Sequence, residues 1–280
     1  MIYSGGFFSG TGFVEAFSES DASVGLMLGS FFAMVITIVF YAVRKVLRFS
    51  DSMACIPEGF KAMVPAILIL VIQQTLILGI GMLGGTAREK NRFHTLVPIS
   101  KHFNGTLRIV FGKSLSYLVL YILVCGWALV VVPELFTLPQ LASPVTLTLF
   151  ILPYLFACIF FSMTLSGFMV SRESPMMIFV FTSVFLLFIS GISWPMHSIP
   201  SFWKATGYLF PSTPGIQGFV RINTMGATLN EVSAEYKLLW IQTGVYFLTA
   251  CLVYRYQIIR SRKLVHLQYS NMKSKQETKE

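Results

Sequence analysis

Long apolar stretches separated by short polar segments dominate the chain. Six stretches contain no Asp, Glu, Lys or Arg: 22–43, 62–87, 114–133, 135–171, 174–203 and 238–254. An α-helix needs about 20 predominantly apolar residues to cross the hydrocarbon core of a bilayer. Because backbone amides in lipid must be hydrogen-bonded within the segment, runs of this length indicate helices rather than strands. The pattern therefore predicts an all-α fold, a polytopic membrane bundle of about six transmembrane helices.

The composition of the 280-residue chain agrees with this prediction. Hydrophobic residues make up 55% and charged residues 12%, whereas soluble domains average roughly a quarter charged residues. The sequence has no phosphate-binding glycine-rich loop ending in Lys-Ser/Thr, no Ser/His/Asp set and no His-Glu-x-x-His motif. We therefore expect a protein that is not an enzyme, with no catalytic residue, no cofactor and no metal site. The four scattered cysteines are expected to be unpaired.

Basic residues predict the orientation of the chain, because cytoplasmic loops are enriched in Lys and Arg. The segment 88–113, the turn around Arg172 and the tail from Arg255 hold six, one and seven of these residues, 14 of the 21 in the chain. All three segments fall on one side of the predicted bundle, so we expect them and the C-terminus to be cytoplasmic. The net charge of +9 then reflects topology, and membrane lipid rather than nucleic acid is the expected partner.

The N-terminal quarter of the chain contradicts this orientation. Four of the seven remaining basic residues lie in 44–61, after the first apolar stretch, whereas residues 1–21 carry only acidic charges. Taken alone, the first stretch would place its C-terminal end in the cytoplasm. The other five stretches predict the opposite.

Polar and small residues inside two of the stretches are candidates for a translocation path or a dimer interface. They are Gln73, Gln74, Thr75, Gly81 and Gly85 in the second stretch and, with a weaker signal, Thr182, Ser183 and Ser190 in the fifth. Amides can hydrogen-bond between helices, and small residues four apart let two helices approach closely. Ordinary packing within one chain explains the same pattern equally well.

The connections between the stretches carry their own signals. Charged and apolar residues interleave in 88–113, which is typical of amphipathic helices that lie on a membrane surface or dock into a partner. A solvated basic loop is the alternative. Aromatic residues and prolines in 194–211 indicate short interfacial helices, 206–235 is predicted to be a polar external loop, and the tail beyond Lys263 is expected to be disordered.

Residues from about 70 to 256 resemble the C-terminal part of the membrane subunit of a type-2 ABC exporter. Arg88-Glu89-Lys90 follows the second stretch, and Leu96-Val97-Pro98-Ile99-Ser100 and Gly112-Lys113 precede the third, in the order of that family. Gly191-Ile192-Ser193-Trp194-Pro195 and Pro211-Ser212-Thr213 resemble the family's hairpin after the fifth helix. His94-Thr95 stands where the family usually has Gly-Thr.

The resemblance implies a permease in the bacterial inner (plasma) membrane. It would pair with a second permease, as a homodimer or heterodimer, and dock on a separate ATP-binding cassette ATPase that drives export of a lipophilic or amphiphilic substrate. The residues implied in coupling to the ATPase are Arg88, Glu89, Lys90, Leu96, Pro98 and Lys113. Gln73, Gln74 and Thr75 would line the dimer interface.

Residues 22 to about 70 instead resemble part of a sodium/proton antiporter, through Arg48-Phe49-Ser50-Asp51-Ser52-Met53 and Glu58-Gly59-Phe60-Lys61. A chimeric chain joined between Pro65 and Gln73 would explain the conflicting charges. The expected organisation is an antiporter-like segment 1–69, a permease-like bundle 70–258 and a basic cytoplasmic tail 259–280. An antiporter fragment and a membrane anchor without transport activity are the alternative functions, although the six stretches lack the acidic residues that ion-driven transport usually needs.

Overall fold

The computed structural model describes residues 22–44, 48–90, 105–138, 140–191 and 199–277. The chain divides into two compact units, Met1–Ala62 and Met63–Glu280. Every regular element in the described ranges is a helix, which confirms the predicted all-α fold.

The first unit contains helix α3 (Ala22–Val43) and the beginning of helix α4 (Phe49–Glu89). Apolar side chains on α3 are exposed, among them Ile36 and Val43. The charges that follow have local partners. The guanidinium carbon of Arg44 lies 5.0 Å from the centre of the Phe40 ring, and Lys61 Nζ lies 3.2 Å from Glu58 Oε1.

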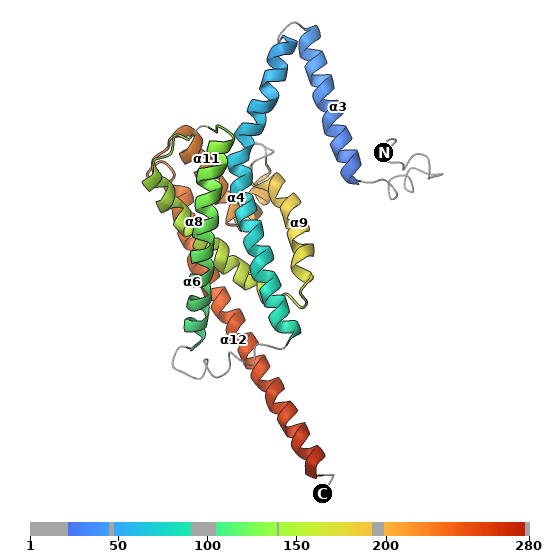
Figure 1. Ribbon diagram of the computed structural model, residues 1–280, viewed down its shortest axis with the longest axis vertical. Helices are drawn as coiled ribbons and strands as arrows, with labels where there is room; N and C mark the ends of the chain where they lie inside the picture. Colours follow the sequence, from blue (N-terminus) through green and yellow to red (C-terminus); the bar gives the residue numbers. More distant parts are fainter. Residues whose placement is uncertain (1–21, 45–47, 91–104, 139, 192–198, 278–280) are drawn as a thin grey trace, which may run out of the picture. The chain divides into compact units, whose positions relative to one another are not determined.

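Helix α8 (Pro144–Ser166) forms the core of the second unit (Figure 1). Tyr154, Ala157, Cys158 and Ile159 on this helix have no exposed surface. Helix α8 packs against α6 (Gly105–Gly126), α11 (Ser212–Met225) and α12 (Ser233–Glu277). It is also bound to α4, because the Tyr154 hydroxyl donates to the carbonyl oxygen of Ile69 at 2.6 Å. The remaining elements are η2 (Trp127–Val131) and α7 (Val132–Leu135), which continue α6, and α9 (Ser174–Ile189) and α10 (Ser201–Gly207).

Four described helical segments are long and apolar enough to cross a bilayer: Met53–Glu89, Gly105–Leu135, Pro144–Ser166 and Ser233–Ser261. Two shorter apolar helices, Leu28–Val43 and Ser174–Ile189, correspond to the first and fifth predicted stretches. The multi-pass bundle is confirmed. Helix α3 covers the whole first stretch, whereas α9 has only 16 residues in the fifth. Helix α9 ends early because Gly191 has a φ of 87°, the left-handed conformation in which helices commonly terminate.

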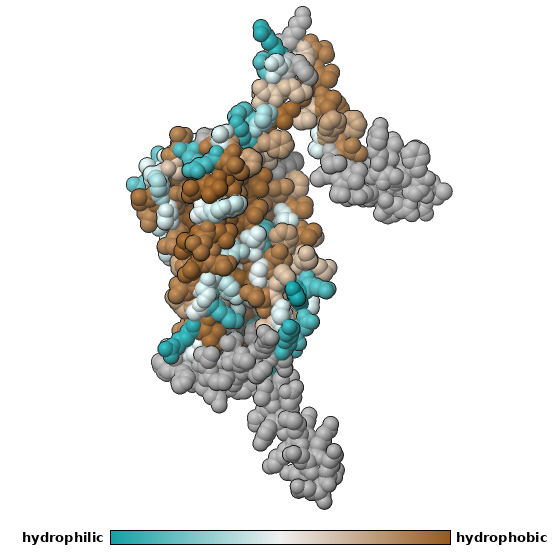
Figure 2. Space-filling model, viewed as in Figure 1, coloured by the Kyte–Doolittle hydropathy of each residue, from teal (hydrophilic) through white to brown (hydrophobic). Residues whose placement is uncertain are grey.

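Exposed apolar side chains cover the surface of the second unit. Leu123 of α6 (72% exposed), Phe181 of α9 (79%) and Leu252 of α12 (66%) are examples. Figure 2 shows apolar side chains over the visible face of this unit, with polar groups toward its two ends. Such a continuous apolar surface is unfavourable in water and suits contact with lipid acyl chains.

Two predictions about the connections are wrong. Residues 206–235, predicted to be a polar external loop, contain α11, which buries Phe219 and Ile222. A Cβ on Gly215 would lie 2.6 Å from the Tyr154 ring, so the small residues of α11 serve close packing on α8 rather than solubility. The tail beyond Lys263 continues α12 to Glu277 instead of being disordered, and no Gly or Pro interrupts residues 245–277. The cysteines are unpaired, as predicted.

Gly81 and Gly85 bring α4 against the start of α9 and the connection that precedes it. A Cβ on Gly81 would lie 2.9 Å from Pro175 Cβ, and a Cβ on Gly85 would collide with the carbonyl oxygen of Ser171. Both glycines therefore serve packing within the chain. A role of Gly81 and Gly85 in a translocation path or a dimer interface stays a prediction.

The close approach at Gly85 gives a stability prediction. Gly85→Ala should destabilise the protein by about 1–3 kcal/mol, because a backbone carbonyl must move to admit the methyl group. Gly244→Ala is the matched control, since Gly244 is exposed within α12 and a Cβ there has no neighbour within 4 Å, and it should be neutral or slightly stabilising. Thermal unfolding of the purified variants in detergent measures the difference. Equal melting temperatures for the two variants would contradict the packing described here.

Candidate functional site

The C-terminal end of α4 is bound to the connection between α8 and α9. Arg88 donates from Nη1 to the carbonyl oxygens of Gly167 and Met169, each at 3.1 Å. Gln257 of α12 donates from Nε2 to the same Gly167 carbonyl at 3.2 Å. Three segments far apart in the sequence thus meet at one peptide group. Hydrogen bonds from a charged donor are roughly twice as strong as neutral ones, so the junction resists separation of α4 from this connection.

Three further predicted coupling residues lie near this junction. Glu89 is exposed, and its Oε2 accepts from the backbone N–H of Arg172 at 3.4 Å. Lys90 is exposed at the end of α4. Lys113 of α6 places Nζ 5.0 Å from the centre of the Tyr254 ring of α12, a favourable position for a cation over an aromatic face.

Leu96 and Pro98, the other two predicted coupling residues, lie outside the described residues. In the sequence, the segment 91–104 that contains them holds Arg92 and Lys101 and no acidic residue. Among the described residues, the structure brings together Arg88, the α8–α9 connection with Arg172, and Gln257, which belong to the three segments that were predicted to share one side of the membrane. The assignment of that side to the cytoplasm stays a prediction.

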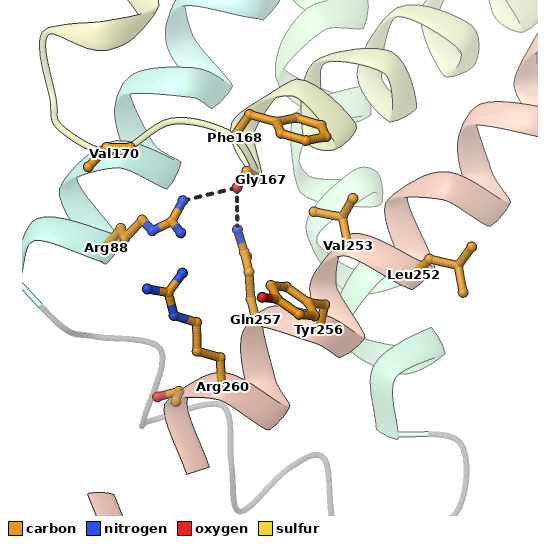
Figure 3. A pocket seen from close by; sticks show the side chains of 10 residues that line it. Arg88, Gly167, Phe168, Val170, Leu252, Val253, Tyr256, Gln257 and Arg260 are labelled. Carbon is orange, nitrogen blue, oxygen red and sulfur yellow. Dashed lines mark hydrogen bonds between the residues drawn. The ribbon is translucent and has the colours of Figure 1, made fainter. Parts of the chain in front are cut away.

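A pocket of about 570 Å³ lies beside the junction (Figure 3). It is lined by Arg88, Gly167, Phe168, Val170, Leu252, Val253, Tyr256, Gln257, Arg260 and Ser261. The sequence did not predict this pocket. The available signal was the spacing of Gln257, Arg260 and Ser261, which places three polar residues on one side of α12 where its apolar part ends.

A second group of candidate residues is buried between α4, α8 and α11. Gln73 has no exposed surface, and its Oε1 accepts from the backbone N–H of Ser212 at 2.6 Å and from Cys158 Sγ at 3.8 Å. Ser212 begins α11, so Gln73 supplies an acceptor to one of the first N–H groups of a helix, which have no partner inside it. Within the described ranges, Gln73 Nε2 and the Ser212 hydroxyl have no hydrogen-bond partner.

Gln74 is directed toward α9. It is 3% exposed, and its Oε1 accepts from the Thr182 hydroxyl at 3.3 Å. Ser183 hydrogen-bonds within α9, to the carbonyl oxygen of Val180 at 2.8 Å. Ser190 is fully buried, and its hydroxyl, like Gln74 Nε2, finds no partner in the part of the chain that the structure describes.

Gln73, Gln74 and Thr75 do not share one face of α4. Consecutive residues of an α-helix point about 100° apart, so three in a row cannot share one face. Gln73 and Gln74 are enclosed by their own chain, whereas Thr75 is exposed and its hydroxyl donates to carbonyl groups of its own helix. The roles of all three residues at a dimer interface or in a translocation path stay predictions.

The contact between Gln73 and Ser212 can be tested by removing the amide. Gln73→Leu keeps much of the side-chain volume but leaves the Ser212 N–H without its acceptor, which should cost about 1–3 kcal/mol. Ser116→Ala is the control, because Ser116 is exposed and its hydroxyl donates to the Gly112 carbonyl of its own helix, and it should change stability by less than about 0.5 kcal/mol. Melting temperatures in detergent provide the comparison, and an unchanged value for Gln73→Leu would show that the hydrogen bond is not needed.

The comparison with protein families covers both groups of candidate residues. Residues 55–252 match the model of the ABC-2 family transporter protein, which is more than half of the chain. No curated protein matches the chain. The match begins at residue 55, ahead of the proposed junction between Pro65 and Gln73, and nothing in it supports an antiporter-like segment or a chimera.

Proposed function

We propose, since the chain belongs to the ABC-2 family of transporter proteins, that a separate ATP-binding cassette ATPase drives it to export a lipophilic or amphiphilic substrate. As a membrane permease of an ABC transporter, the chain must receive the energy of ATP hydrolysis through a contact surface. The observation that supports this proposal best is the junction at Arg88, where the end of α4, the α8–α9 connection and α12 meet.

A partner that contacts Glu89 and Lys90 would act directly on this junction. Both residues are exposed and immediately follow Arg88, which is hydrogen-bonded to the α8–α9 connection. A displacement there would pass to α9 through that connection and to α12 through Gln257. We therefore propose Arg88, Glu89, Lys90 and Lys113, with Leu96 and Pro98 of the adjoining segment, as the surface that meets the ATPase.

An apolar pocket and two buried amides support a lipophilic or amphiphilic substrate. A pocket of about 230 Å³ lies between α6 and α8, and its walls include Cys125, Leu129, Ile151 and Leu155. The buried amides of Gln73 and Gln74 have donors without partners among the residues described. A path that combines apolar walls with a few polar groups suits a molecule with both kinds of surface.

An uncovered face of α4 supports assembly with a second permease. Ile67, Val71, Thr75, Gly79 and Leu83 recur every four residues and are all exposed. Thr75 and Gly79 are small, and helix pairs in membranes associate through small residues that let backbones approach. We propose that this stripe, rather than the Gly81 and Gly85 face, contacts the second permease of a homodimer or heterodimer.

The coupling surface predicts a position-specific effect on ATP hydrolysis. Glu89→Lys reverses an exposed charge and should lower ATP hydrolysis by the ATPase that copurifies with the chain by about tenfold, equivalent to roughly 1.4 kcal/mol. Glu134→Lys is the control, because Glu134 is exposed in α7 beyond the far end of α6. Hydrolysis is measured in proteoliposomes. Equal effects of both variants, or sodium-dependent proton flux without any ATPase, would contradict the proposal.

The N-terminal segment is expected to be dispensable for the bundle. The boundary between the compact units follows Ala62, and all the candidate site residues lie after it. A chain truncated before Ala62 should still insert into membranes, because the packing and hydrogen bonds described for the site lie within 63–280. Carbonate extraction and protease protection of the truncated chain provide the measurement, and complete failure to insert would refute this expectation.

A further inference from the structure

The pocket beside Arg88 brings two arginines together without a neighbouring carboxylate. Arg88 of α4 and Arg260 of α12 both line it, and Figure 3 shows their guanidinium groups directed toward the same space. The ion pairs formed by described residues involve neither of them. Like charges that face one space repel each other, and an anion placed between them adds two attractions that offset this repulsion.

The pocket also contains hydrogen-bond donors that are not in use. Arg88 makes both of its hydrogen bonds through Nη1, which leaves the other nitrogens of the guanidinium group for a ligand. Ser261 is 6% exposed, and its hydroxyl has no partner among the residues of known placement. Planar guanidinium groups bind phosphate oxygens through paired hydrogen bonds, so these donors suit a phosphate group.

The remaining walls of the pocket are apolar and open to the lipid. Phe168, Val170, Leu252 and Tyr256 are all more than 60% exposed. A tyrosine beside basic residues is typical of the headgroup level of a membrane. Leu252 continues into exposed Leu248 on the previous turn of α12, which extends the apolar surface away from the arginines. A soluble anion would gain nothing from these walls, whereas a lipid would use them for its acyl chains.

We propose that this pocket is a binding site for an anionic glycerophospholipid of the surrounding leaflet. Its phosphate lies between Arg88 and Arg260 and accepts from Ser261, and its acyl chains follow the exposed side of α12 from Leu252. Because Arg88 also binds the α8–α9 connection, the lipid stabilises the junction at the end of α4. The site is complete within one chain and does not depend on the ATPase.

The test measures lipid binding to the purified full chain in detergent, without an ATPase. Phosphatidylglycerol is the anionic probe, phosphatidylcholine is the zwitterionic comparison, and native mass spectrometry gives the affinities. Arg260→Gln should weaken phosphatidylglycerol binding by about tenfold, and Ser261→Ala by a few-fold. Arg255→Gln is the matched control, since Arg255 is an exposed arginine of the same helix that does not line the pocket, and it should change the affinity less than twofold.

Several outcomes would overturn the proposal. Equal losses of phosphatidylglycerol affinity in Arg255→Gln and Arg260→Gln would show general attraction to a basic surface. Equal affinity for the two lipids would show that the site does not distinguish an anionic headgroup from a zwitterionic one. Displacement of the lipid by inorganic phosphate at equal concentration would assign the pocket to a soluble anion instead. If Arg260→Gln fails to fold, as judged by its melting temperature without lipid, an unchanged affinity in Ser261→Ala decides against the site.

Discussion

The hydrogen bonds from Arg88 to the carbonyl oxygens of Gly167 and Met169 fix the end of α4 to the connection between α8 and α9. Helices surrounded by lipid gain little from the hydrophobic effect when they associate, so close packing and hydrogen bonds carry much of the association. Gly85 provides the close approach and Arg88, one turn further, provides the polar contact. Both proposed sites at this end, for the ATPase and for the lipid, depend on this pair of contacts.

A few hydrogen bonds also connect the helices deeper in the bundle. Gln73 gives its carbonyl oxygen to the first turn of α11, and Tyr154 gives its hydroxyl to a carbonyl of α4. Unpaired polar groups are costly in an apolar environment. The partnerless donors of Gln73 and Gln74 are therefore the places in this region where a polar substrate group or a water molecule would be stabilised most.

The sequence was sufficient to predict the bundle, because the apolar stretches and their helical character follow from bilayer thickness and backbone hydrogen bonding. The sequence was insufficient to predict α11. Gly215 and the polar residues of this segment are typical of a loop, and the reason they form a packed helix is the contact with the Tyr154 ring. The sequence marks Gln73 and Gln74 as polar residues in an apolar stretch, but their burial against α11 and α9 depends on tertiary packing. The pocket at Arg260 could not be predicted from the sequence, because its lining residues come from three separate segments.

The two proposed ligands of the basic end share one side chain, and this has a thermodynamic consequence. Arg88 contributes to the lipid pocket with one part of its guanidinium group and binds the α8–α9 connection with another. If docking of an ATPase displaces that connection, the geometry offered to the lipid phosphate changes with it. Linkage then requires the effect to be reciprocal: whatever factor the lipid imposes on ATPase affinity, the ATPase imposes on lipid affinity. A permease built in this way would sense the anionic lipid content of its leaflet through the same arginine that stabilises its coupling surface.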